Sequence, residues 1–188
     1  MINELCKQTK VYGEYGAFEK ENFDKKLEKL RDNATYKSFE NDKSDVKKIR
    51  HIPTINEQLE GKCHPTTGVP FVKRIFYVDG EKVEGVFPKF NSKFDVRIPK
   101  ELYKASDEEQ FKYCVKQLAK KIESDPEFAK QFTPRQIEQI KNGETKISGL
   151  TWHHNERPGL MQLVSSEEHS RTAHTGGRSI WGGGTSCR

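Results

Sequence analysis

Long apolar runs are missing from this 188-residue sequence. No window approaches the roughly 18 consecutive apolar residues that a membrane-spanning helix needs, so we expect no membrane insertion. The first twenty residues also lack an apolar core of the signal-peptide type. That second absence is ambiguous, because the chain could be the C-terminal fragment of a larger exported protein.

Cysteine pairs and a strong excess of one charge are missing as well. The four cysteines, Cys6, Cys63, Cys114 and Cys187, lie far apart and form no CxxC pair. We therefore expect reduced thiols and no structural zinc knuckle. The 33 basic and 28 acidic residues leave a net charge of +5. Such a mild excess permits a polyanionic partner but does not require one.

Three regions can be distinguished along the chain. Residues 1–50 are dense in charged side chains, with helical spacing near 17–31 and a charge run over 41–48. We interpret them as a helical and linker region. Residues 51–148 carry the strand and helix patterns of a scaffold, and residues 149–188 hold four of the six histidines.

The scaffold begins with strands. The β-branched and aromatic residues of 71–78, the turn signal Asp79-Gly80 and the returning run 81–87 predict a β-hairpin. Residues 94–98 predict a third strand, which ends at Pro99.

Two helices follow the strands. Ser106 and Glu109 have the spacing of a capping box, and apolar residues then recur at helical spacing up to Ser124. Thr133-Pro134 predicts the start of a second helix, which Gly143 ends.

The histidines of the last region fall on a predicted hairpin and helix. Residues 151–154 and 160–164 have the pattern of two strands around a turn. Ser165 then caps a helix that Gly176-Gly177 ends. This arrangement brings the histidines of the first strand opposite His169. Because imidazole binds transition metals and also takes a proton near neutral pH, the pattern predicts a cation site with its own general base.

Three interpretations stay open on spacing alone. The first is a metal-dependent nuclease, in which a cation offsets charge on the phosphorane while a histidine not bound to it activates water. The second is a metal site with different hydrolytic chemistry. The third is a hairpin that carries surface histidines without any site.

A family resemblance adds to this pattern. The run Trp152-His153-His154, within 149–184, resembles the catalytic module of His-Me finger nucleases, the HNH/endonuclease VII superfamily. It is similar to the group with a Trp-His-His signature at the C-terminus of bacterial polymorphic toxins. Residues 61–71 and 83–88 resemble the region upstream of that module in toxins of the LXG and contact-dependent inhibition types. The resemblance covers residues 60–188.

The resemblance implies a role for each histidine. His153 and His169 map onto metal ligands, and His154 maps onto the general base. In the related colicin DNases two helix histidines one turn apart both bind metal, which makes His174 the candidate for a further ligand. His169 and His174 are five positions apart, however, which is about 140° on a regular helix. Either the helix ends before His174, or His174 contacts the scissile phosphate. Gln162 is the nearest amide to the middle Asn of the HNH motif.

Three other side chains carry weaker expectations. We expect Trp152 to be a core residue rather than a platform for base stacking. Arg178 follows two glycines, so it is a candidate for phosphate binding, with ordinary surface charge as the alternative. We expect His64 to have a structural role in its loop.

Together these observations predict an α+β fold, with helices, a small antiparallel sheet and a C-terminal ββα-metal finger over 149–188. The expected function is that of a metal-dependent endonuclease toxin that cuts DNA with little sequence specificity. His153, His169 and His174 would bind the metal, and His154 and Arg178 would be catalytic. The resemblance also implies secretion or delivery from a bacterium into a target-cell cytoplasm, and a cognate immunity protein that neutralises the toxin.

The sequence leaves alternatives open for the identity of the metal ion and for the substrate. One divalent ion is expected; zinc, nickel, magnesium and manganese are all candidates, and zinc is the one favoured in crystals. An RNase that cuts tRNA on the same scaffold is the first alternative function. A non-catalytic module that binds nucleic acid or metal is the second.

Overall fold

The computed structural model of the protein describes residues 49–187. The chain divides into two units, Met1–Lys47 and Lys48–Arg188, and the second unit is the one described below. The helix predicted near 17–31 and the charge run over 41–48 lie outside the described residues. None of the helices within 49–187 is both long and apolar enough to cross a membrane.

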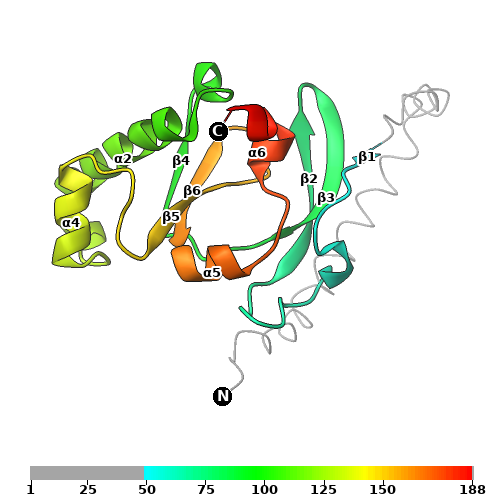
Figure 1. The fold of residues 1–188 in the computed structure, drawn as a ribbon, viewed down its shortest axis with the longest axis horizontal. Helices are drawn as coiled ribbons and strands as arrows, with labels where there is room; N and C mark the ends of the chain where they lie inside the picture. Colours follow the sequence, from blue (N-terminus) through cyan, green and yellow to red (C-terminus); the bar gives the residue numbers. More distant parts are fainter. Residues whose placement is uncertain (1–48, 188) are drawn as a thin grey trace, which may run out of the picture. The chain divides into compact units, whose positions relative to one another are not determined.

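The strands form two three-stranded sheets (Figure 1). The first contains the predicted hairpin, made of β2 (Phe71–Val78) and β3 (Glu81–Pro88). The turn residues Asp79 and Gly80 have positive φ angles of 50° and 82°, as a two-residue type I′ turn requires. The short strand β1 (Arg50–His51) pairs in parallel with β3.

The second sheet contains the histidine hairpin, with the order β4-β6-β5. Strands β5 (Leu150–His154) and β6 (Leu160–Ser165) are antiparallel, as predicted. The third predicted strand, β4 (Phe94–Arg97), pairs with β6 rather than with the first hairpin. The α+β class is therefore confirmed, with the strands divided between two sheets and the second sheet spanning both the scaffold region and the histidine region.

Two predicted helices are present with their caps. Helix α2 (Asp107–Ser124) has both bonds of the capping box between Ser106 and Glu109. Helix α4 (Pro134–Lys141) has the corresponding box at its start, and a one-turn helix α3 (Pro126–Ala129), absent from the prediction, lies between them. The remaining short elements are 3₁₀ turns: η3 (Glu57–Leu59), η4 (Lys100–Leu102) and η5 (Gly184–Cys187).

The helix after the histidine hairpin is shorter than predicted. Helix α5 (Ser166–Arg171) begins at the expected cap, where Ser165 Oγ accepts the Glu168 N–H. It ends at Arg171, so the expectation that Gly176-Gly177 ends it is wrong. The chain leaves the helix at Thr172, whose backbone is extended (φ −105°, ψ 94°). The Thr172 hydroxyl lies 2.7 Å from the Glu168 carbonyl oxygen and 2.7 Å from the Thr67 hydroxyl, so a residue outside the hairpin and helix holds the chain at this point. Gly177 instead begins a separate short helix, α6 (Gly177–Ile180).

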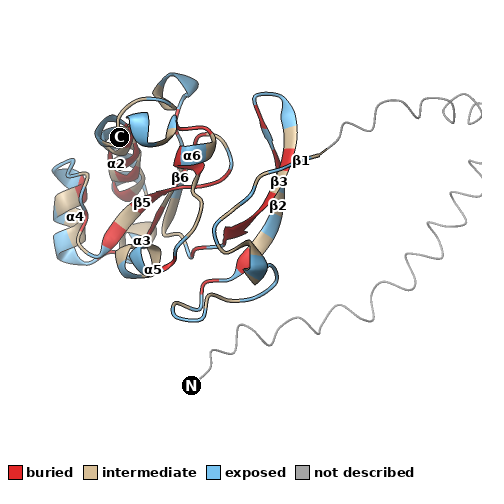
Figure 2. Cartoon of the chain, turned by 45° about the vertical axis from the view of Figure 1, so that its right-hand side comes forward, coloured by how far each residue is buried: buried red, intermediate tan, exposed pale blue. Residues whose placement is uncertain are grey.

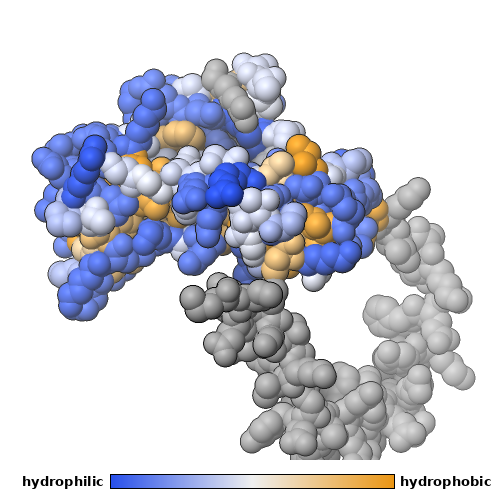
Figure 3. Space-filling view, turned by 60° about the horizontal axis from the view of Figure 1, so that its bottom comes forward, coloured by the Kyte–Doolittle hydropathy of each residue, from blue (hydrophilic) through white to orange (hydrophobic). Residues whose placement is uncertain are grey.

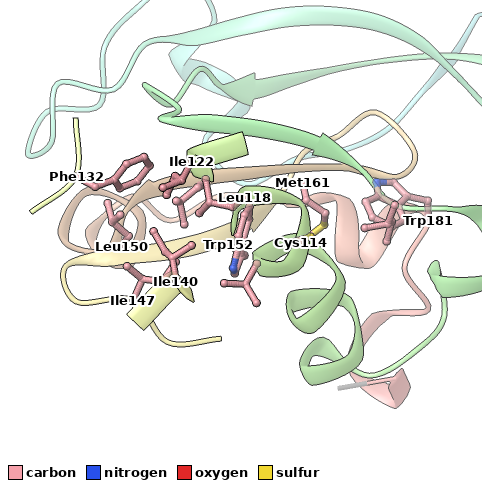
Figure 4. Packing of buried hydrophobic residues seen from close by; sticks show 13 residues of the cluster. Cys114, Leu118, Ile122, Phe132, Ile140, Ile147, Leu150, Trp152, Met161 and Trp181 are labelled. Carbon is pink, nitrogen blue, oxygen red and sulfur yellow. The ribbon is translucent and has the colours of Figure 1, made fainter. Parts of the chain in front are cut away.

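The main core lies between α2, α4 and the second sheet (Figure 4). Helix α2 contributes apolar side chains one turn apart, which pack against the inner face of β5 and β6. Figure 2 shows buried residues on α2 and on the strands of that sheet, and the face drawn in Figure 3 is mainly hydrophilic with a few apolar areas. The labelled core residues are Cys114, Leu118, Ile122, Phe132, Ile140, Ile147, Leu150, Trp152, Met161 and Trp181.

Candidate metal centre and catalytic cavity

The three predicted ligands lie close together. His153 on β5, His169 on α5 and His174 in the loop after α5 each place one ring nitrogen within 4.8 Å of the others. His153 Nδ1 and His169 Nε2 are 3.2 Å apart. Two nitrogens that bind one zinc ion at its usual bond length and tetrahedral angle lie about 3.3 Å apart. The donor set and this spacing therefore fit a divalent transition metal.

Burial keeps these imidazoles in the form that can bind a metal. Burial lowers the pKa of His153 well below its usual value, and the neighbouring His174 and His169 lower it further. Burial, with a smaller contribution from His174, lowers the pKa of His169 to about 4. The pKa of His174 is lowered by burial as well. Since a protonated imidazole cannot bind a cation, all three rings are ready as ligands at neutral pH.

The orientation of His174 is set by its own backbone. Its Nδ1 donates a hydrogen bond to the Thr172 carbonyl oxygen at 2.6 Å, which leaves the lone pair on Nε2. A hydrogen bond from the second ring nitrogen to a carbonyl oxygen is the usual support of a metal-binding histidine. Because α5 ends at Arg171, His174 is off the helix, and the five-residue spacing from His169 is no obstacle to a shared site.

The loop that carries His174 is tied to the segment before β2. Asn56 Nδ2 donates to the Ala173 carbonyl oxygen at 2.7 Å, and the Ile55 N–H donates to Thr175 Oγ1 at 3.0 Å. The bond between Thr67 and Thr172 adds a third connection. Residues more than a hundred positions earlier in the sequence thus hold the third candidate ligand in place, and sequence reasoning did not identify them.

One aromatic ring packs against all three histidines. The Phe90 ring centroid lies 4.8 Å from that of His153, 5.4 Å from that of His169 and 5.2 Å from that of His174. Phe90 is buried and follows β3, so the first half of the chain supplies an apolar wall of the site. No sequence pattern singled out this residue.

His154 points away from the cluster of three histidines. Successive side chains of a strand point to opposite faces, and His154 lies against α2, where its Nε2 is 2.6 Å from Gln110 Oε1. The same nitrogen lies 3.7 Å from Asp107 Oδ1. The prediction that both strand histidines lie opposite His169 is therefore correct for His153 alone.

Arg178 is buried beside His154 rather than exposed. Its Nε lies 3.2 Å from Asp107 Oδ1, and its Nη2 donates to the carbonyl oxygens of Ala105 and Cys187. Its Nη1 is buried and has no hydrogen-bond partner among residues 49–187. Burying a cationic nitrogen without a partner is costly, so this atom is suited to an anionic group that enters the cavity.

These side chains line one cavity of about 410 Å³. The three candidate ligands, His154 and Arg178 all contribute to its wall, so the five predicted site residues share one space. The lining residues are Asp107, Phe111, Thr151, Trp152, His153, His154, His169, His174, Gly176, Arg178, Ser179, Gly184 and Thr185.

The weaker sequence expectations have mixed outcomes. Trp152 is buried in the main core, as expected. His64 has the structural role predicted for it, because its Nδ1 lies 3.1 Å from the Thr67 hydroxyl. Gln162 is bonded to Asn155 and Asp95 and does not line the cavity.

Three of the four cysteines lie within the described residues. Cys63, Cys114 and Cys187 form no disulfide within residues 49–187. Burial raises the pKa of the Cys114 thiol to about 12, so this side chain acts as a small apolar group of the core.

Comparison with known proteins agrees with this geometry. A family model described as the DNase/tRNase domain of colicin-like bacteriocin matches residues 79–176, more than half of the chain. The chain belongs to this family. Neither the curated proteins nor the solved structures gave a significant match. Family membership makes the chain a nuclease domain of the bacteriocin toxin type, and the matched span includes all four histidines of the cavity.

Proposed function

We propose that this chain is a metal-dependent endonuclease of the His-Me finger type, with the Trp-His-His signature, that hydrolyses DNA. The observation that supports the proposal best is the shared cavity, in which three neutral imidazoles converge beside a fourth histidine and a buried arginine. A scaffold or binding module has no need for this combination of a cation site, a base and an anion site in one space.

The side chains divide the chemistry between them. His153, His169 and His174 would hold one divalent ion, which supplies positive charge that stabilises the phosphorane and the leaving oxygen. His154, on the other face of β5, would take a proton from the attacking water. Arg178 would donate Nη1–H to a phosphate oxygen and so hold the scissile group in place.

DNA is the substrate that this arrangement favours. RNA carries a 2′-hydroxyl that can itself attack the adjacent phosphorus, so RNA cleavage needs only acid and base groups. DNA lacks that hydroxyl, and an external water needs both a base and charge neutralisation at the phosphate. The convergent imidazoles supply the second requirement. Cleavage of tRNA remains the alternative, since the matched family includes both DNases and tRNases.

Digestion of plasmid DNA and total RNA in parallel tests the proposal. The purified chain should nick plasmid DNA, lose activity in EDTA and regain it when zinc, nickel, magnesium or manganese is added. Cleavage of RNA without DNA would support the tRNase alternative. Binding of nucleic acid without hydrolysis under every metal would support the non-catalytic module.

We also propose that the chain acts as a delivered toxin in interbacterial competition and is neutralised by a cognate immunity protein. A nuclease made in a cell that contains its own substrate must be silenced, and an acidic inhibitor near a phosphate-binding cavity would be captured fast at low salt. Expression of the wild-type chain alone should kill cells, whereas the His154→Ala variant should be tolerated. Co-expression of an acidic partner encoded beside the toxin should restore growth. Harmless expression of the wild type with metal present would contradict the toxin proposal.

A further inference from the structure

Gln110 is a fully buried polar residue that the predicted chemistry does not use. It lies in the first turn of α2 and has no exposed surface. Its side chain makes three hydrogen bonds: Nε2 donates to the carbonyl oxygens of Leu102 at 2.7 Å and Tyr103 at 2.9 Å, and Oε1 lies 2.6 Å from His154 Nε2. A buried amide in this position links the scaffold directly to the histidine hairpin.

The orientation of this amide is determined by its surroundings. A carbonyl oxygen can only accept a hydrogen bond, so the group that faces the Leu102 and Tyr103 oxygens must be the NH₂ group. Rotating the amide by half a turn would put Oε1 against two other oxygens at 2.7 and 2.9 Å. Both contacts would then be repulsive and two buried acceptors would lose their donor. Oε1 is therefore the atom that meets His154.

The fixed amide in turn determines which ring nitrogen of His154 carries the hydrogen. Since Gln110 Oε1 can only accept, His154 Nε2 must carry the hydrogen that bridges the 2.6 Å contact. We propose that Gln110 is a positioning residue, which holds His154 as the Nε2–H tautomer with its basic lone pair on Nδ1. In the proposed reaction the water proton moves to Nδ1, the electron pair of the broken O–H bond stays on the attacking oxygen, and Nε2–H stays bonded to Gln110. The kinetic part of this inference rests on the proposed function, whereas the tautomer does not.

Asp107 is the competing candidate for this role. Its Oδ1 lies 3.7 Å from the same His154 nitrogen, which is beyond hydrogen-bond distance, and 3.2 Å from Arg178 Nε. The shorter contact pairs Asp107 with the guanidinium. The geometry thus assigns His154 to Gln110 and Arg178 to Asp107.

The tautomer can be measured directly by NMR. The zinc-loaded chain, labelled with ¹⁵N-histidine by cell-free synthesis, gives long-range ¹H–¹⁵N correlations that distinguish a protonated from an unprotonated ring nitrogen. The His154 signals are identified by their loss in His154→Asn. We expect a protonated Nε2 and an unprotonated Nδ1 in the wild type, and a loss of this preference in Gln110→Met, which keeps the side-chain length and removes the acceptor.

Kinetics and a matched control complete the test. Removing a group that supports a site residue typically costs 10–100-fold. The kcat for plasmid cleavage should therefore fall by about that factor in Gln110→Met, with KM and zinc affinity little changed. Gln139→Met is the control, because Gln139 also bonds a backbone group, the Ser148 N–H, but has no hydrogen bond to His154 within residues 49–187.

Two results would overturn the assignment. A proton on His154 Nδ1 in the wild type would exclude it, and retention of Nε2–H in Gln110→Met would transfer the role to Asp107. If the wild type shows Nε2–H and Gln110→Met loses this preference, but the wild type does not cut nucleic acid, the proposed function fails while the positioning role stands.

Discussion

Two neighbouring histidines occupy different environments in this protein. His153 contacts the rings of Phe90, His169 and His174, whereas His154 contacts Gln110 and the rings of Phe111 and Trp181. The cause is the alternation of side chains along a strand, because neighbouring residues of a strand point to opposite faces of the sheet. The residue proposed as a metal ligand and the residue proposed as a proton acceptor thus stand next to each other in sequence but in separate surroundings.

Substitution of the two residues should separate these roles. His154→Ala should lower plasmid cleavage by about 10²-fold or more, the scale for loss of general base catalysis, and should still bind zinc. His153→Ala should lose both zinc binding and cleavage. Calorimetric zinc titration and a nicking assay measure the two effects, and His64→Ala, a histidine outside the cavity, serves as the control. If His154→Ala lost zinc and His153→Ala kept it, the two roles would have to be exchanged.

The Phe90 ring should matter for metal binding although it has no ligand atom. Phe90→Leu keeps an apolar side chain but removes the flat surface that contacts all three imidazoles, so zinc affinity should fall by about tenfold, the lower end for residues that support ligands. Competition with a chelator measures the affinity. Phe132→Leu is the matched control, because Phe90 and Phe132 are each 6% exposed and Phe132 packs in the main core. Equal effects of the two substitutions would mean that Phe90 acts only through general stability.

At the scale of elements, α6 depends on a glycine at its start. A methyl group at Gly177 would collide with the Asn155 carbonyl oxygen and with the Trp181 indole ring. These two groups are already joined by a 2.9 Å hydrogen bond from Trp181 Nε1. The close approach fixes α6 beside the turn of the histidine hairpin, and Arg178 is the next residue.

Gly177→Ala should therefore destabilise the protein by about 1–3 kcal/mol, the usual cost of overpacking a dense interior. Urea unfolding measures this change. Gly176→Ala is a control from the adjacent position, where the nearest atom to an added Cβ would be the His154 carbonyl oxygen at 3.4 Å, an ordinary contact. Comparable stability of the two variants would contradict the close packing of α6.

The elements show which features the sequence could predict. The hairpins and the capped helices depend on local signals, such as Asp79-Gly80 and Ser106 with Glu109, and these predictions are confirmed. The end of α5 could not be predicted from its own sequence, because Thr172, the residue after the helix, bonds to Thr67 from a distant part of the chain. The pairing of β4 with β6 is likewise a tertiary event that neither strand encodes alone.

The candidate site likewise contains residues that the sequence identified and residues that it did not. The four histidines were singled out by residue type and spacing, and His174 was made a candidate ligand by the family resemblance. The structure brings His153, His169 and His174 together and places His154 in the wall of the same cavity but away from that cluster. Gln110 and Phe90 were missed, because an amide in a helix and an aromatic after a strand have no motif of their own. Only the packing of α2 and the first sheet around the hairpin brings them to the histidines.

At the scale of the whole molecule, the cavity joins parts from both halves of the described chain. The loop of residues 55–67 holds His174, and α2 supplies Asp107 to the cavity wall and Gln110 to the contact with His154. The hairpin and α5 supply the other candidate ligands. The first sheet also contacts the turn of the hairpin, where Arg74 lies 3.7 Å from the buried carboxylate of Glu156. Folding of the whole unit is thus a condition for assembling the site.

This assembly should make the stability of the metal-free protein depend on pH. Burial lowers the pKa of His153, His169 and His174, that of His169 to about 4, while the unfolded chain keeps values near 6.5. As the pH falls from about 6.5 towards 4, the unfolded chain takes up protons that the folded chain does not, so folding becomes less favourable. Above about 6.5 neither state takes them up, and the contribution of these rings to stability is fully present.

Thermal unfolding in EDTA at pH 7.5, 6.0 and 5.0 measures this effect, with a lower Tm expected at each step. The variant with His153, His169 and His174 all replaced by Asn measures how the other titrating groups change stability with pH. One of these groups is Glu156, whose pKa is raised by burial. Its protonation therefore stabilises the folded state as the pH falls. The wild type should lose more stability than this variant over the same range. Added zinc should raise the wild-type Tm most at pH 7.5, because it binds the folded state and competes with protons for the same nitrogens. Equal pH dependence of the two proteins would mean that the three imidazoles are not buried together.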